Sequence, residues 1–328
     1  MRNEILTIRK RRCEKTMGDW YEARPRLLLS RCFFEYTRYD GNTISNDLVK
    51  RLSKCCDVVR VCPELEIGLG VPREPIDVFS MGNELKLMNK TSKIDLTEKM
   101  VTFSKDFAKS LSQDEIDGMI LKAKSPSCGL RDARLYGSNG KVVSKTYGFF
   151  AREMVESFPD LPIESEMRLN DSRIRFDFLS SIFAIARFRN VVSKSELIEF
   201  QRRYKFFILA KNERTMREMG KLAAQKGFTQ EMKHDYMRLL MKALKTPMKK
   251  TSVINTLLHI YGFFKELLTS EEKAYFMDLL EGYKDGLVTL QTINAVLKSW
   301  AISHKVAYIK DQVFFEPYPG ELEPIEDM

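Results

Sequence analysis

Several features of common protein classes are missing from this chain. The 328-residue sequence contains no apolar run of about 18 residues, so it predicts no membrane-spanning helix and no membrane partner. Its N-terminal segment is charged throughout and lacks the apolar core of a secretion signal. These absences predict a cytoplasmic protein. No internal repeat and no low-complexity tract is present either.

Histidine is scarce, and no two cysteines have the Cys-x-x-Cys spacing that marks a local metal motif. The three histidines all lie beyond residue 230, whereas the six cysteines all lie within the first 128 residues. The histidines are therefore poor candidates to share a site with the cysteines. In a cytosolic chain, cysteines concentrated in one half favour metal binding or catalysis over disulfides.

Length and charge give weaker indications. At about 150 residues per domain, the chain predicts roughly two domains. Lysine and arginine number 54 and aspartate and glutamate 45, a formal net charge of +9 that favours anionic partners. Because the excess is spread over both halves, a solvated surface explains it as well as nucleic-acid binding does.

The N-terminal half shows a strand–helix–strand pattern with a cysteine after each strand. Residues 26–30 and 58–61 are short apolar runs typical of buried strands, and residues 45–55 have helical apolar spacing between them. Cys32 and Cys62 follow the two strands. Because such strands pair in parallel, their carboxyl ends meet at one sheet edge. A third apolar run, residues 118–123, leads to Cys128.

The second half has a different pattern. From residue 174 onward the spacing of apolar residues is helical almost without a break, with few glycines and prolines. We therefore predict a basic extension over 1–24, an α/β domain over 25–168 and an all-helical domain over 169–328. The expected fold class is a small parallel sheet flanked by helices, followed by an all-α domain.

Cys32, Cys62 and Cys128 form the most informative constellation. Three thiolates at one sheet edge suit either zinc or an iron–sulfur cluster, because soft thiolates bind both. Three unrelated buried cysteines remain the alternative. Ligands of α/β proteins sit beyond the carboxyl ends of the strands, which favours a site at this edge.

Polar residues in the same loops are candidates for chemistry. Glu64, two residues after Cys62, suits general acid–base catalysis. Ser125 and Ser127 flank a proline before Cys128 and are candidates to orient water or substrate, although capping of a turn is equally expected. The weak candidates for substrate binding in these loops are Arg38, Asp40 and Arg73. For Arg73, a structural ion pair is favoured over substrate binding.

Three motifs in this order resemble the thiouracil desulfurase (TudS) family over about residues 25–165. They are Ser30-Arg31-Cys32 with Arg38-Tyr39-Asp40-Gly41, then Val61-Cys62-Pro63-Glu64 with Gly68-Leu69-Gly70-Val71-Pro72-Arg73, then Lys124-Ser125-Pro126-Ser127-Cys128-Gly129. Residues from about 190 to 320 resemble the helical YbgA-like domain. The marks of that second resemblance are Met219-Gly220-Lys221-Leu222-Ala223, His259-Ile260-Tyr261-Gly262-Phe263-Phe264-Lys265 and Pro317-Tyr318-Pro319.

The first resemblance implies a [4Fe–4S] cluster held by Cys32, Cys62 and Cys128, with one iron open. That iron would take the sulfur of a small thiolated substrate such as 2-thiouracil, and water would replace the sulfur to give uracil and hydrogen sulfide without net redox change. Glu64 and a serine would carry the proton transfers, with Ser125 favoured over Ser127.

Two other functions remain open at this point. The chain could be a nucleic-acid-binding protein, related to transfer RNA, in which the metal is structural and the positive charge contacts phosphates. It could also be a zinc-stabilised interaction protein. Thiolated uridines occur in transfer RNA, so desulfuration and RNA binding are compatible.

Overall fold

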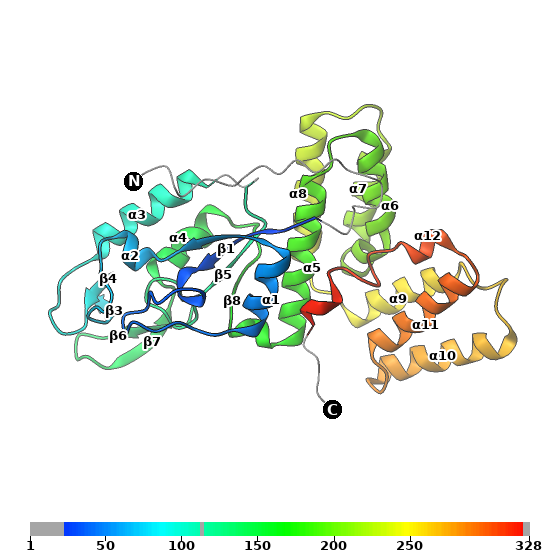
Figure 1. The fold of residues 1–328 in the computed structure, drawn as a ribbon. Coiled ribbons are helices and arrows are strands. Elements are labelled where there is room, and N and C mark those ends of the chain that lie inside the picture. Colours follow the sequence, from blue (N-terminus) through cyan, green and yellow to red (C-terminus); the bar gives the residue numbers. More distant parts are fainter. Residues whose placement is uncertain (1–22, 112–114, 324–328) are drawn as a thin grey trace.

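The computed structural model describes residues 23–111 and 115–323 (Figure 1). The predicted basic extension therefore lies almost wholly outside the described residues. None of the helices in the described part of the chain is long and apolar enough to span a membrane.

A parallel four-stranded sheet forms the centre of the N-terminal half. Its strands stand in the order β2-β1-β5-β8, and each neighbouring pair is parallel. Their bounds are β1 Arg26–Ser30, β2 Asp57–Val61, β5 Gly118–Leu121 and β8 Ile163–Ser165. The predicted α/β class is confirmed, and all four carboxyl ends lie at one edge.

The helix between the first two strands is set by its cap and its apolar face. Asn46 accepts the backbone N–H of Val49 at the start of α1 (Asp47–Cys55), a typical N-cap. Val49 and Leu52 of this helix are buried against the sheet. The predicted strand–helix–strand unit is therefore present.

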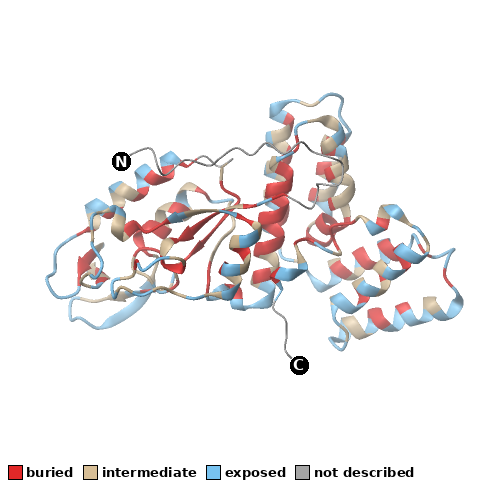
Figure 2. Ribbon diagram, viewed as in Figure 1, coloured by how far each residue is buried: buried red, intermediate tan, exposed pale blue. Residues whose placement is uncertain are grey.

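Helices cover both faces of the parallel sheet. One face packs against α3 (Thr97–Ser110) and α4 (Phe149–Ser157), and the other packs against α1 and α5 (Ser172–Arg189). Figure 2 shows α5 and the central strands as largely buried. Although α5 lies in the region predicted as all-helical, it supplies one of the layers that cover the sheet.

A second sheet was not predicted from the sequence. Its order is β4-β3-β6-β7, with β3 and β6 parallel and the two outer pairs antiparallel. The strands are β3 Ile76–Met81, β4 Glu84–Asn89, β6 Ala133–Tyr136 and β7 Val142–Thr146. A short helix, α2 (Pro63–Glu66), follows β2 of the parallel sheet and precedes β3 of the second sheet.

The C-terminal half is helical, as predicted. After α5 come α6 Lys194–Lys211, α7 Glu213–Ala224, α8 Gln230–Leu244, α9 Lys250–Tyr261, α10 Ser270–Asp285, α11 Leu290–Ser303 and α12 Ala307–Lys310. Single 3-10 turns, η2 Arg31–Phe33, η3 Arg168–Asn170 and η4 Gly320–Leu322, complete the chain. Ser193 and Glu196 form a capping box at the start of α6.

Aromatic rings fill much of the helical core. Phe188 stacks on Tyr236 with ring centroids 4.8 Å apart, and Phe200 stacks on Tyr204 at 4.2 Å. The two halves are joined at Asp117, which accepts hydrogen bonds from the backbone N–H of Arg26 and from the guanidinium of Arg189. These contacts hold α5 beside the starts of β1 and β5.

Candidate active site

A cavity of about 480 Å³ opens at the carboxyl edge of the parallel sheet. Cys32, Cys62 and Cys128 all line it, from the loops that follow β1, β2 and β5. All three are free and buried. Residues of β3 and β6, including Asp77 and Tyr136, contribute to the wall as well.

Local backbone geometry places Cys128. The hydroxyl oxygen of Ser125 accepts the backbone N–H groups of Ser127 (3.2 Å) and Cys128 (3.1 Å), which closes the turn around Pro126. Gly148 packs so closely on this turn that an added Cβ would stand 2.4 Å from the carbonyl of Ser127. The glycine is therefore required by close approach of two backbone segments.

Burial dominates the acidity of the three thiols in the metal-free protein. Burial, aided by the nearby Cys62, raises the pKa of Cys32 to about 12. Burial also raises the pKa of Cys62 and that of Cys128. A hydrogen bond from Ser30 opposes this effect by lowering the pKa of Cys128. The three thiols therefore influence one another, and each must lose a proton to bind a metal.

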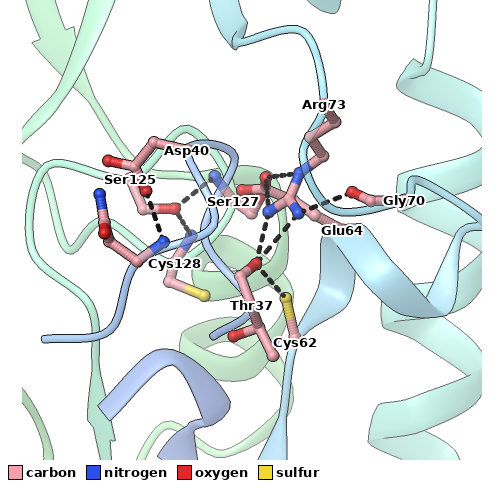
Figure 3. A network of polar contacts seen from close by, with 10 residues as sticks. Thr37, Asp40, Cys62, Glu64, Gly70, Arg73, Ser125, Ser127 and Cys128 are labelled. Atoms are coloured by element: carbon pink, nitrogen blue, oxygen red, sulfur yellow. Dashed lines mark hydrogen bonds and ion pairs between the residues drawn. The ribbon is translucent and has the colours of Figure 1, made fainter. Parts of the chain in front are cut away.

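Glu64 and Arg73 form a nearly buried ion pair beside the cysteines (Figure 3). The Arg73 guanidinium donates to Oε2 of Glu64 through Nη2 (2.6 Å) and Nε (2.9 Å). The hydroxyl of Ser127 donates to the other oxygen, Oε1, at 3.0 Å. All these donors require acceptor oxygens, so the arrangement suits the ionised carboxylate.

Arg73 also ties this pair to the loop of Cys62. Its Nη1 and Nη2 both donate to the carbonyl of Thr37 at 3.0 Å, and the thiol of Cys62 lies 3.9 Å from the same oxygen. The hydroxyl of Thr37 is buried and has no hydrogen-bond partner among the described residues. Thr37 lines the cavity as a residue, but its hydroxyl oxygen is not accessible from it.

The two predicted serines occupy different places. Ser125 lines the cavity, whereas Ser127 is fully buried and reaches the site only through Glu64. Arg38 lines the cavity and pairs with Asp40 at 3.0 Å. Asp40 itself is exposed, closes a local turn by accepting the backbone N–H of Asn42, and is not part of the wall.

Sequence reasoning missed Lys122 and Glu166. Lys122 directly follows β5 and lines the cavity, and its ammonium donates at 2.7 Å to Glu166, which directly follows β8. The signal was available, because the strand-end rule that singled out the cysteines applies to these two positions as well.

Cations without an ion-pair partner among the described residues also line the cavity. They are Lys90, Lys124 and Arg134. All three are exposed residues. They make the wall predominantly positive where solvent reaches it, in contrast to the neutralised Glu64–Arg73 pair.

Three free cysteines at one cavity have the side-chain chemistry that an iron–sulfur cluster requires. Among residues 23–111 and 115–323, no group of three His, Cys, Asp or Glu side chains is placed to hold one metal ion. A four-iron cluster binds its cysteines through different irons, so the thiolates need not meet at a point. Three free buried thiols around one cavity satisfy that requirement.

Comparison with known proteins finds two family models that match separate stretches of the chain. Residues 27–166 match the family model described as 2-thiouracil desulfurase, and residues 205–319 match the model described as a protein of unknown function, DUF1722. The fold and site define an α/β domain with a cysteine-lined cavity. The chain is therefore similar to the 2-thiouracil desulfurase family in its N-terminal half and to the DUF1722 proteins in its C-terminal half.

Two relatives are each similar to part of the chain. YbbK of Bacillus subtilis (strain 168), an uncharacterized protein, is 33% identical over 101 residues, which cover 28% of this chain and 64% of YbbK, just under two thirds. YbgA of Escherichia coli (strain K12), also uncharacterized, is 24% identical over 154 residues, covering 44% of this chain and 91% of YbgA.

One solved structure is also similar, a [4Fe-4S]-dependent thiouracil desulfidase, TudS. It is 22% identical, covers 47% of this chain and 98% of its own, and has a TM-score of 0.36. A likeness at this level does not establish a shared function.

Proposed function

We propose that the protein is a desulfurase that hydrolyses the thiocarbonyl of a thiolated pyrimidine to a carbonyl, releasing hydrogen sulfide. The observation that carries the proposal is the meeting of Cys32, Cys62 and Cys128 at one cavity with Glu64. The family match spans the cysteines, the carboxylate and both serines, which supports the assignment. Water supplies the new oxygen, so no electron donor or acceptor is needed.

Cys32, Cys62 and Cys128 would hold a [4Fe–4S] cluster at the inner wall. When bound, the cluster would supply Lewis-acid chemistry toward the sulfur of a thiocarbonyl.

Glu64 is the group placed to accept a proton from the attacking water. Its carboxylate is held in position from both sides, by Arg73 at one oxygen and by Ser127 at the other. Its remaining lone pairs are available to water, because each carboxylate oxygen accepts more than one hydrogen bond. Ser127 and Arg73 are thus positioning residues, and Ser125 lines the cavity where substrate binds.

The positive wall favours a substrate that carries a negative charge. Lys90, Lys124 and Arg134 are exposed, line the cavity and have no ion-pair partner among the described residues. A phosphate attached to the thiolated base would satisfy them, because lysine and arginine are common phosphate ligands. This favours, as a second candidate, a nucleic acid that carries the thiolated base.

Turnover measured without oxygen tests the proposal. Purified protein is incubated with 2-thiouracil and, separately, with 4-thiouridine monophosphate, and sulfide and desulfurated pyrimidine are both quantified. We expect the two products in equal amounts, and faster turnover of the phosphorylated substrate at low salt, with the advantage falling as salt rises. Cluster-containing protein that releases sulfide from neither substrate would overturn the proposal.

A further inference from the structure

Among the described residues of the cavity wall, Arg31 directly follows β1 and pairs with Glu66 on α2. The other cation of the wall that directly follows a strand of the parallel sheet is Lys122, after β5. Register places it there, because Leu121 of β5 is paired with Ser165 of β8, so Lys122 and Glu166 are the next residues on neighbouring strands. The backbone N–H of Lys122 donates to the hydroxyl of Ser30 at 2.9 Å. Lys122 is therefore held against Ser30, the last residue of β1, and Ser30 precedes Cys32 by two residues.

The ammonium of Lys122 is held but not saturated. It donates to Oε1 of Glu166 and to the carbonyl of Ala123, both at 2.7 Å. The other oxygen of Glu166 accepts the backbone N–H of Ala123, also at 2.7 Å. A lysine ammonium has three N–H donors, and no acceptor for the third is present in the described part of the chain. One donor thus remains for a ligand.

Burial distinguishes Lys122 from the exposed lysines at the same cavity. Its side chain is 22% exposed and that of Glu166 only 6%. The ammonium lies close enough to Cys32 to lower the pKa of that thiol against the effect of burial. Lys122 therefore belongs to the inner part of the cavity, where the cysteines are, and a charge there acts in a medium of low polarity.

We propose that Lys122 is a catalytic residue that binds the second ring carbonyl of the substrate, the one that remains when the other position carries sulfur. This inference rests on the proposed function. Thiolated uracils have such a carbonyl, conjugated through the intervening ring nitrogen with the carbon that loses sulfur. A hydrogen bond from an ammonium withdraws electron density from that carbon and assists attack by water.

The step balances without any further reactant. The oxygen of water forms a bond to the ring carbon as the electron pair of the C=S bond moves onto sulfur. The C–S bond then breaks, the new C=O bond forms, and sulfur leaves with the two protons of water as hydrogen sulfide. Lys122 neither gains nor loses a proton, and its charge offsets the negative charge that builds up in the ring.

If Lys122 binds the second carbonyl, its contribution to kcat/KM should be confined to substrates that have this carbonyl. A purely structural role would affect all substrates alike. Pyrimidine-2-thione has the thiocarbonyl but not the second carbonyl, so it cannot use Lys122. In wild-type protein we expect kcat/KM for 2-thiouracil to exceed that for pyrimidine-2-thione by about 10²–10³-fold, the effect of one donor at a developing charge. Lys122→Met should abolish this preference, so that kcat/KM for 2-thiouracil falls to the level of that for pyrimidine-2-thione.

A second variant guards against a folding defect. Lys122→Met alone leaves the buried Glu166 without its cation, which is destabilising. The double variant Lys122→Met/Glu166→Gln removes both charges and keeps an oxygen for the backbone N–H of Ala123. Lys122→Arg, which keeps the charge, should retain part of the preference. Lys109→Met, on the exposed side of α3, removes a positive charge outside the cavity and serves as the matched control.

Product binding provides a readout that does not depend on turnover. By calorimetry, wild-type protein should bind uracil more tightly than pyrimidin-2-one by about tenfold, and the double variant should bind both equally. The inference is overturned if the double variant keeps the wild-type preference for 2-thiouracil or for uracil. Failure of the proposed function looks different: wild-type protein would desulfurate neither substrate, and calorimetry alone would then decide the role of Lys122.

Discussion

The two halves of the molecule treat polar groups in opposite ways. In the α/β half, cysteines and a Glu64–Arg73 pair that is nearly inaccessible to solvent surround a cavity. In the helical half, aromatic rings fill the core, and many ion pairs, such as Glu199 with Arg202, are partly exposed to solvent. Because burying charge is costly unless it is paired, a buried pair at a cavity indicates chemistry more strongly than a surface pair does.

Burial of charge alone does not identify a site. Lys211 in the helical half has a fully buried ammonium, yet it is bound by Asp177 and by the carbonyls of Leu244 and Thr246. All three of its N–H donors are used, and it does not line the cavity that contains the three cysteines. Lys122 differs on both counts, which is why the two lysines are given different roles.

The largest expected effect is that of Cys62→Ser. A hydroxyl is a poor ligand for iron compared with a thiolate, so the variant should lose the cluster and all desulfurase activity. Cluster content is measured by iron analysis and visible absorption, and turnover by sulfide release. Cys55→Ser, on α1 and away from the cavity, is the matched control and should retain both. Full activity in a cluster-free Cys62→Ser protein would exclude the proposed mechanism.

Glu64→Gln separates catalysis from cluster binding. The amide keeps the shape of the side chain but cannot accept a proton, so kcat should fall by about 10²–10⁴-fold with iron content unchanged. Glu66→Gln changes the same residue type two positions later on α2, where Glu66 pairs with Arg31 instead. That control should keep most of its activity. Equal losses in the two variants would show that the effect comes from charge at α2 and not from proton transfer.

Phe200→Ala tests whether the aromatic core of the helical half serves stability and not catalysis. Phe200 is fully buried and stacks on Tyr204, so its truncation should lower the free energy of unfolding by about 3–5 kcal/mol. Chemical denaturation measures this change. Turnover of 2-thiouracil per folded molecule should stay near the wild-type value, since Phe200 does not line the cavity. A loss of turnover in fully folded protein would mean that the two halves are coupled in catalysis.

Glu199→Gln should have the smallest effect. Hydrogen bonds from Arg202 and Arg203 lower the pKa of Glu199 from 4.5 to about 2. A carboxyl whose pKa is lower in the folded state stabilises the protein above its unfolded pKa, and this contribution is lost as pH falls toward the folded pKa. The site is partly exposed to solvent, so we expect a loss of about 0.2–1 kcal/mol at pH 7 that shrinks below pH 4.5. A difference in stability that does not change with pH would contradict this explanation.

Local patterns in the sequence predicted much of this structure. The apolar runs that became β1 and β2, and the helical spacing between them, were sufficient to place Cys32 and Cys62 at one edge, because parallel strands leave few other arrangements. The all-helical second half followed from its apolar period. In each case, residues close in sequence carried the information.

Long-range pairing could not be predicted in the same way. Nothing local showed that Arg73 would bind Glu64 or that Lys122 would meet Glu166, since each pair depends on how separate loops come together. The second sheet was missed because its strands do not alternate regularly between buried and exposed residues: β3 and β4 are half buried in uneven patterns, and β7 is largely exposed. The packing of α5 on the parallel sheet was also missed, because a buried helix has the same pattern in either half.

The central claim is that Cys32, Cys62 and Cys128 hold an iron–sulfur cluster at the catalytic cavity. It is tested most directly by measuring iron and acid-labile sulfide in protein purified without oxygen, together with the visible spectrum. The account predicts about four of each per chain and broad brown absorption, as for a [4Fe–4S] cluster. Colourless protein that contains zinc, or no metal after anaerobic reconstitution, would contradict it.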